Sequence, residues 1–151
     1  MKRFANHNAG QPIYQLILIL DEIKKEYLKA ADKVKDQVLS LLFRNFGYQK
    51  IRYINELKSF VNRLGDTEMD QFTISLLQRT CAQLKHNYKP QPQMRLIQSC
   101  IRGEEIAIEN YSTAIQQVRQ YDEVRAILQQ QVNGIKTVLN TIREYTAKCY
   151  C

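Results

Sequence analysis

The sequence predicts an all-α protein built as a four-helix bundle. Apolar residues recur at alternating intervals of three and four over four stretches of about 25 residues each, which is the pattern of long helices that pack along one seam. Helix-breaking residues are few, with five glycines and three prolines in 151 residues. This length is that of one domain with a sizeable core.

The first two helices are expected at residues 12–36 and 38–64. Pro12 suits a first helical turn, where no backbone N–H is needed, and Gly65 is a typical residue just past a helix end. The seam of the first helix comprises Leu16, Leu20, Ile23, Tyr27, Ala30 and Val34. The seam of the second is apolar except at Lys50, and comprises Leu39, Phe43, Phe46, Lys50, Tyr53, Leu57, Phe60 and Leu64.

The other two helices are expected at residues 94–118 and 122–147. Asp122 and Glu123 favour a helix start, because acidic side chains complement the positive end of the helix dipole. The seam of the third helix breaks only at Glu104, and comprises Ile97, Ile101, Glu104, Ile108, Tyr111, Ile115 and Val118. The seam of the fourth breaks only at Gln131, and comprises Val124, Leu128, Gln131, Ile135, Val138, Ile142 and Tyr145.

The lengths of the connections predict the topology. Two are very short, so each joins antiparallel neighbours, whereas residues 66–93 can cross the whole bundle and carry an extra amphipathic helix of their own. Two helical hairpins joined by one long crossover form the ferritin-like arrangement. We therefore expect a disordered segment at 1–11, the bundle at 12–147 and a frayed tail at 148–151.

The polar residues in the seams predict a buried polar network. Counting from the connections places Lys50 near the level of Glu104, so we expect a buried Glu104–Lys50 pair that offsets the cost of burying a carboxylate. Gln131 lies nearer the level of Tyr111, which predicts a hydrogen bond between them. Next to Glu104, the side chains of Glu105 and Glu109 are expected at the surface, with Arg102 as a neighbour.

Several segments, in this order, resemble a bacterial family of ferritin-like four-helix-bundle proteins of unknown function: "EYLKAADKVKD", "RYINELKSFVNRLG", "LLQRTCAQLK", "CIRGEEIAIENY" and "VRAILQQQV". The resemblance covers about residues 13–145, and "CIRGEEIAIENY" is its most specific piece. It implies a ferritin-like fold and no established reaction. The chain departs from the family pattern at Leu139, where a histidine is expected, and at Cys81, where an aromatic residue is expected.

A ferritin-like di-iron site is not expected. Such a site takes a Glu from each of two helices and Glu-x-x-His from each of the other two. Glu104 is the one candidate metal ligand, because the other expected ligand positions hold Lys50, Ile23 and Leu139. Glu-x-x-His is absent from the sequence, whose two histidines are His7 and His86. We expect no metal and no other cofactor.

The cysteines give no second site. Cys149 and Cys151 could in principle bind a soft metal or form a redox pair, but a zinc site normally takes four ligands, so no specific role is expected. Cys100 lies beside the seam, as a small core residue would.

The polar "NHNAGQP" near the start argues against a signal peptide, and no stretch is apolar enough for a membrane span. A cytoplasmic location with reduced thiols follows.

Three functions remain open at this point. The first is a non-catalytic module that binds a protein partner or forms a homodimer, since no catalytic residues form a known enzyme motif. The alternative is a divergent metal-binding protein or oxidoreductase that uses Glu104. The third, a binder of nucleic acid or anionic lipid, would use the net charge of +7. We do not expect nucleic acid or a membrane as partner, because basic and acidic residues interleave along the helices.

Overall fold

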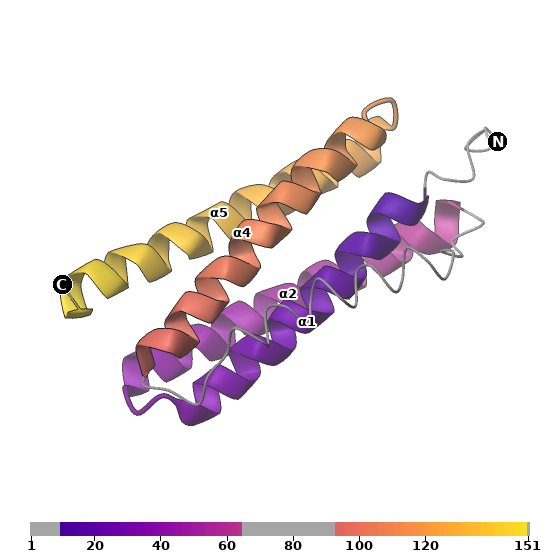
Figure 1. Cartoon of the computed structure of the whole chain (residues 1–151). Coiled ribbons are helices and arrows are strands. Elements are labelled where there is room, and N and C mark those ends of the chain that lie inside the picture. Colours follow the sequence, from indigo (N-terminus) through magenta and orange to yellow (C-terminus); the bar gives the residue numbers. More distant parts are fainter. Residues whose placement is uncertain (1–9, 65–92, 151) are drawn as a thin grey trace.

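A computed structural model of the chain describes residues 10–64 and 93–150, without the side chains of 62–64, 149 and 150. Four helices make up this part: α1 (Gln11–Lys33), α2 (Gln37–Leu64), α4 (Gln93–Gln117) and α5 (Asp122–Tyr150). The described residues contain no strand. The all-α four-helix bundle expected from the sequence is confirmed (Figure 1).

The turn between α1 and α2 begins earlier than the sequence suggests. α1 ends at Lys33 instead of residue 36, because Val34 is extended and Asp36 serves as the N-cap of α2. The Oδ1 atom of Asp36 accepts hydrogen bonds from the backbone N–H groups of Val38 (2.9 Å) and Leu39 (3.2 Å). At the N-cap, a short acidic side chain can accept hydrogen bonds from the N–H groups of the first turn, which have no partner within the helix. This favours Asp36 as the N-cap of α2 over Asp36 as the last residue of α1.

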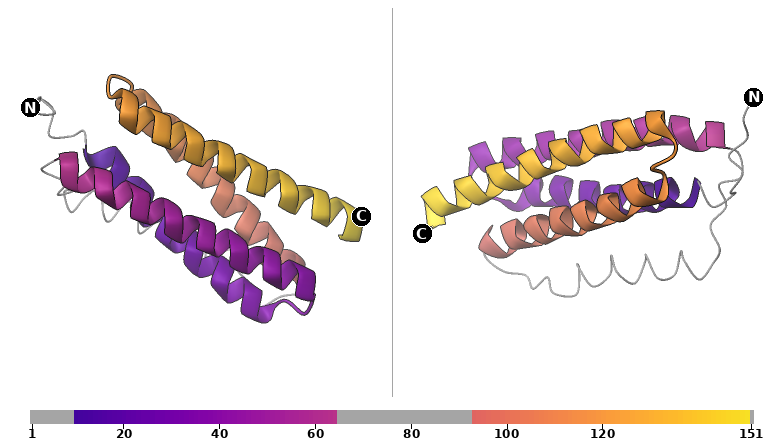
Figure 2. Two further views of the ribbon diagram at one scale, coloured as in Figure 1. Left: turned by 180° about the vertical axis from the view of Figure 1, so that it is seen from behind. Right: turned by 90° about the horizontal axis from the view of Figure 1, so that it is seen from above.

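The two hairpins lie against each other with α2 parallel to α4 and α1 parallel to α5 (Figure 2). The α1–α2 turn, the start of α4 and the end of α5 share one end of the bundle. There the backbone N–H of Lys35 donates to the Gln93 side chain (3.1 Å), and the Tyr145 hydroxyl donates to Asp36. These contacts tie the first hairpin to the second.

The core follows the expected seams closely. All six residues of the first expected seam are buried, five of them on α1 and Val34 just past its end, and in the expected seam of α5 only Tyr145 is half-exposed. On α4 the inward face is rotated slightly, so that Cys100, Gly103 and Ala107 are more buried than Ile101 and Ile108. This face of α4 packs against α1, where Gly103 lies next to Ile23.

Glycines allow close helix contacts at two places. A Cβ atom on Gly47 of α2 would lie 2.9 Å from Leu28 Cδ2 of α1, which is too close without movement. A Cβ atom on Gly134 of α5 would overlap the Tyr53 hydroxyl of α2, whereas one on Gly103 would make an ordinary contact with Ile23 Cγ1 at 3.4 Å. Gly47 therefore allows α1 and α2 to pack closely at the middle of the first hairpin.

Several expectations lie outside the described residues. These are residues 1–9 of the segment expected to be disordered at 1–11, the extra helix expected in the crossover, and Cys151 of the expected tail at 148–151. Gln11, in contrast, is described and is already the first residue of α1. α5 itself continues to Tyr150, three residues past the expected end at 147. None of the described helices has a stretch long and apolar enough to span a membrane.

Candidate functional site

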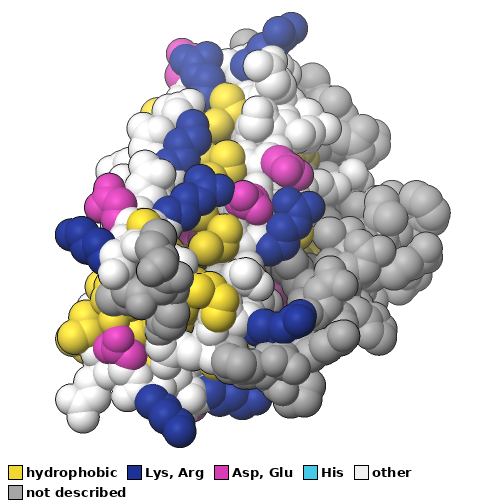
Figure 3. All heavy atoms as spheres, turned by 60° about the vertical axis from the view of Figure 1, so that its left-hand side comes forward, with side chains coloured by type: hydrophobic (Ala, Val, Ile, Leu, Met, Phe, Trp, Pro, Cys, Tyr) yellow, Lys and Arg dark blue, Asp and Glu magenta, His cyan; other side chains and the backbone are white. Residues whose placement is uncertain are grey.

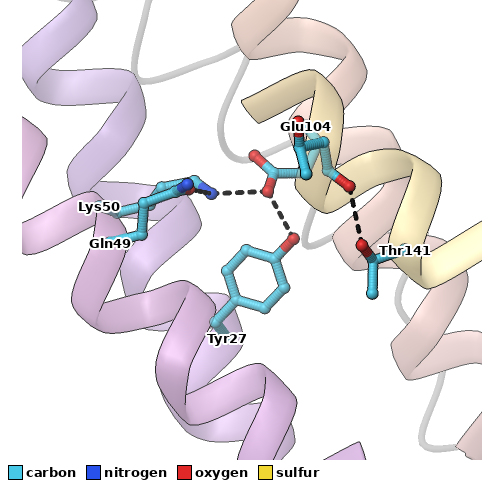
Figure 4. A network of polar contacts seen from close by, with 6 residues as sticks. Tyr27, Gln49, Lys50, Glu104 and Thr141 are labelled. Atoms are coloured by element: carbon cyan, nitrogen blue, oxygen red, sulfur yellow. Dashed lines mark hydrogen bonds and ion pairs between the residues drawn. The ribbon is translucent and has the colours of Figure 1, made fainter. Parts of the chain in front are cut away.

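The middle of the bundle holds a cluster of three polar side chains from three helices, which we call the central cluster: Tyr27 of α1, Lys50 of α2 and Glu104 of α4. All three are fully buried. The Nζ atom of Lys50 donates to Glu104 Oε2 at 2.6 Å, and the Tyr27 hydroxyl donates to the same oxygen at 2.6 Å. Figure 4 shows both side chains directed at the Glu104 carboxylate. The structure thus brings Lys50 and Glu104 together as the seams suggest.

Two further contacts stabilise the Lys50 ammonium. It donates to Gln49 Oε1 at 2.7 Å, and its Nζ lies 5.1 Å from the centroid of the Tyr27 ring. The second distance is that of a cation–π contact, which gains strength where water is excluded. Tyr27 therefore contacts both charges of the pair, the carboxylate through its hydroxyl and the ammonium through its ring.

Burial shifts both members of the ion pair toward their neutral forms. Loss of water raises the pKa of Glu104, and the opposing effects of the Lys50 charge and the two hydrogen bonds do not cancel it. Loss of water likewise lowers the pKa of Lys50 against the attraction of Glu104. The pair is thus held at a cost, as buried ion pairs commonly are.

One oxygen of the central cluster has no hydrogen bond. Both donors converge on Glu104 Oε2, and Glu104 Oε1 is buried with no hydrogen-bond partner among the described residues. Thr141 of α5, labelled in Figure 4, donates instead to the backbone carbonyl of Thr137 (2.9 Å). A carboxylate with a free oxygen is the one feature of the central cluster that suits a cation.

Cys100 lies one turn before Glu104 on α4 and is buried. Its pKa is raised well above the ordinary range, first by loss of water and then by the negative charges of Glu104 and Glu26. The thiolate is the form that attacks electrophiles and binds metals. Cys100 is therefore held as a thiol, in agreement with its expected role as a small core residue.

A second polar cluster, the lateral cluster, joins the buried Tyr111 of α4 and Gln131 of α5 to Glu56 of α2, which is exposed. The Tyr111 hydroxyl donates to Gln131 Oε1 at 2.6 Å. Gln131 Nε2 in turn donates to Glu56 Oε1 at 2.8 Å and to the backbone carbonyl of Tyr53 at 3.3 Å. The hydrogen bond between Tyr111 and Gln131 is the contact that their levels in the two seams suggest.

The described residues do not assemble a metal centre. No group of three or more His, Cys, Asp or Glu side chains in this part of the chain could hold a metal ion. Ile23 and Leu139 are buried apolar residues. Glu105 lies at the surface, where it pairs with Arg102 (3.6 Å) and Arg143 (2.7 Å). Glu109 is exposed.

Four other candidate residues cannot be placed. His7, His86 and Cys151 are not described, and the side chain of Cys149 is not described either.

Tyr27, in contrast, is a site residue that sequence reasoning missed. Its inward position follows from the seam of α1, but the expected neighbour of Glu104 on that helix was Ile23. A tyrosine side chain is long enough to bring its hydroxyl to a carboxylate one turn further along.

Comparison with known proteins gives a family and no relative with an assigned role. A family model described as "Domain of unknown function (DUF2383)" matches residues 10–117. This range covers α1, α2 and α4, including all three members of the central cluster. No curated protein and no solved structure matches the chain.

Proposed function

This chain belongs to the DUF2383 family, whose description names no reaction, and we propose that it is a non-catalytic ferritin-like helical module that acts through contacts with a protein partner or a second copy of itself. The observation that carries the proposal is the ion pair at the centre of the bundle. In a di-metal carboxylate protein, this position holds metal ligands from the facing helices.

Lys50 is the residue that argues most directly against a metal. Its ammonium lies 2.6 Å from Glu104 Oε2 and is fully buried, so a metal ion bound to that oxygen would meet an unscreened positive charge. The ammonium itself supplies the positive charge that a buried carboxylate needs. The central cluster is in this respect a substitute for a metal centre.

The arrangement of the helices supports the ferritin-like part of the proposal. A parallel pair formed by the second and third helices of the bundle requires a long crossover, which residues 65–92 are long enough to provide. A cytoplasmic location belongs to the same proposal, and the free thiol of Cys100 supports it. A bacterial origin, which the resemblance implies, is also part of it.

The iron content of the protein tests the proposal. We expect protein purified from iron-supplemented cells to contain far less than one iron per chain, for the wild type and for Lys58→Gln alike. Lys58 is exposed on the same helix as Lys50, so this variant is the control for the loss of one lysine. A content of about two irons per chain, as in di-iron proteins, would refute the proposal.

A divergent metal-binding protein or oxidoreductase is the second candidate, and the free Glu104 Oε1 atom favours it. For this candidate, Lys50→Gln should raise the metal content while Lys58→Gln does not, because only Lys50 opposes a cation at Glu104. Equal metal content in both variants would refute it.

A further inference from the structure

The outer face of α2 carries large apolar side chains that the bundle does not cover. Val38 is 59% exposed, Leu41 is 61% exposed and Tyr48 is 48% exposed. Figure 3 views the molecule from the side at the left of Figure 1, and it shows hydrophobic side chains that reach the surface between charged ones. Single exposed apolar residues are normal on a protein surface, whereas apolar residues that gather on one face of it are a feature of contact sites.

The spacing of these residues is that of a packing seam. Val38, Leu41, Asn45, Tyr48 and Arg52 follow one another at alternating intervals of three and four residues, and we call these five residues the outer seam. The inner seam of α2, which includes Leu39, Phe43 and Lys50, already faces the bundle. A second seam with the same period is what a helix needs when another helix packs on its outer side.

The outer seam is complementary to itself when two copies run antiparallel. A two-fold axis at Asn45 places Leu41 of each copy against Tyr48 of the other, since these residues lie four before and three after Asn45. Val38 and Arg52 lie seven residues to either side, so the apolar stem of Arg52 covers Val38 of the other copy. An asparagine at the centre of such a seam fixes register.

Charges beside the outer seam fit the same arrangement. Arg44 and Asp32 form an ion pair of 3.3 Å on the α1 side of α2, next to Asn45, and the Asp32 side chain is 73% exposed. A two-fold axis at Asn45 places the Arg44–Asp32 ion pairs of the two copies side by side and antiparallel. Arg44 of each copy then faces Asp32 of the other, so that the charges alternate.

We propose that the outer seam of α2 binds the same seam of a second copy, in an antiparallel, two-fold symmetric dimer. This inference rests on the proposed function and specifies which of its partners is bound and where. One helix pair with five seam positions on each side forms a small interface, so the dimer is expected to dissociate on the order of micromolar concentration.

A concentration series in analytical ultracentrifugation tests the proposal. The wild type should shift from monomer to dimer with rising concentration, and Leu41→Glu should weaken the dimer at least tenfold. Ala126→Glu adds the same charge at an exposed position of α5 and should leave the dimer unchanged. Equal behaviour of the two variants, or a wild type that stays monomeric, would overturn the inference.

The Arg44–Asp32 ion pair allows a second test, in which two variants of opposite charge are mixed. Arg44→Glu and Asp32→Arg should each remain mostly monomeric, because like charges then meet across the axis. An equimolar mixture of the two variants should dimerise, since every facing pair is then opposite in charge. No gain on mixing would overturn the proposed geometry. Metal content is independent of these results, so the proposed non-catalytic role and this interface can fail separately.

Discussion

The central and lateral clusters both interrupt an apolar seam, yet they use different physical means. In the central cluster a full ion pair is completely buried, and one carboxylate oxygen has no hydrogen bond from any described residue. In the lateral cluster the buried groups, Tyr111 and Gln131, are both uncharged. Both ends of the Gln131 amide have a partner there.

The difference indicates which cluster loses more stability when one of its side chains is replaced. A neutral hydrogen bond contributes modestly, and a buried group left without its partner costs about 1–3 kcal/mol. A buried charge left without its counter-charge costs more, about 3–5 kcal/mol. The central cluster should therefore tolerate the loss of a single member far less well than the lateral cluster.

The largest effect is expected for Lys50→Met, which leaves Glu104 buried beside no positive charge. We expect the free energy of unfolding to fall by about 3–5 kcal/mol in urea titrations at neutral pH. The triple variant Tyr27→Phe/Lys50→Met/Glu104→Leu should return to within about 2 kcal/mol of the wild type, because apolar groups replace the whole cluster. If the single variant is as stable as the wild type, the Glu104–Lys50 pair does not form in solution.

An intermediate effect is expected for two separate variants, each of which removes one tyrosine hydroxyl from one of the clusters. Tyr27→Phe deletes a hydrogen bond to a charged carboxylate, worth about 1.5–3 kcal/mol, whereas Tyr111→Phe deletes one to a neutral amide, worth about 1 kcal/mol. Both tyrosines are fully buried, so each variant is the control for the other. Unfolding titrations that rank Tyr111→Phe as the more damaging change would contradict the comparison.

The smallest effect concerns pH and contrasts the fully buried Glu104 with Asp36, which is half-buried at the end of the bundle. Hydrogen bonds from the Tyr145 hydroxyl and from the N–H groups of Leu39 and Val38 hold the pKa of Asp36 below its ordinary value of 3.8. The stability that Asp36 contributes is thus complete above pH 3.8 and is lost as the pH falls through the lower folded-state pKa. Asp36→Asn should flatten the stability profile in this acidic range.

Glu104 should act in the opposite sense, because burial raises its pKa above the ordinary 4.5. The ionised form is the disfavoured one, so its cost should be full above the folded-state pKa and should disappear as the pH falls toward 4.5. Glu104→Gln should flatten the stability profile in this higher range and Asp36→Asn should not. Unfolding titrations at several pH values measure both, and identical profiles for the two variants would contradict the assignment.

The sequence predicted the helices and the inward polar residues well, because both depend on period alone. Lys50, Glu104 and Gln131 each interrupt an otherwise apolar seam, so their burial could be inferred without knowledge of the packing. The role of Tyr27 could not, since an aromatic residue in a seam looks the same whether its hydroxyl has a partner or not. The rotation of α4 toward Cys100 and Gly103 was also missed, because it depends on how α4 packs against α1 and not on the period of its own sequence.

The contacts of Glu104 also constrain how this sequence can change over time. Replacing Lys50 alone leaves the buried carboxylate without its counter-charge, and replacing Glu104 alone leaves the buried ammonium without its counter-charge. A lineage that converts the central cluster to apolar packing, or to metal ligands, has to pass through a destabilised intermediate. The two positions should therefore vary together or not at all, so that natural variants at one carry a matching change at the other.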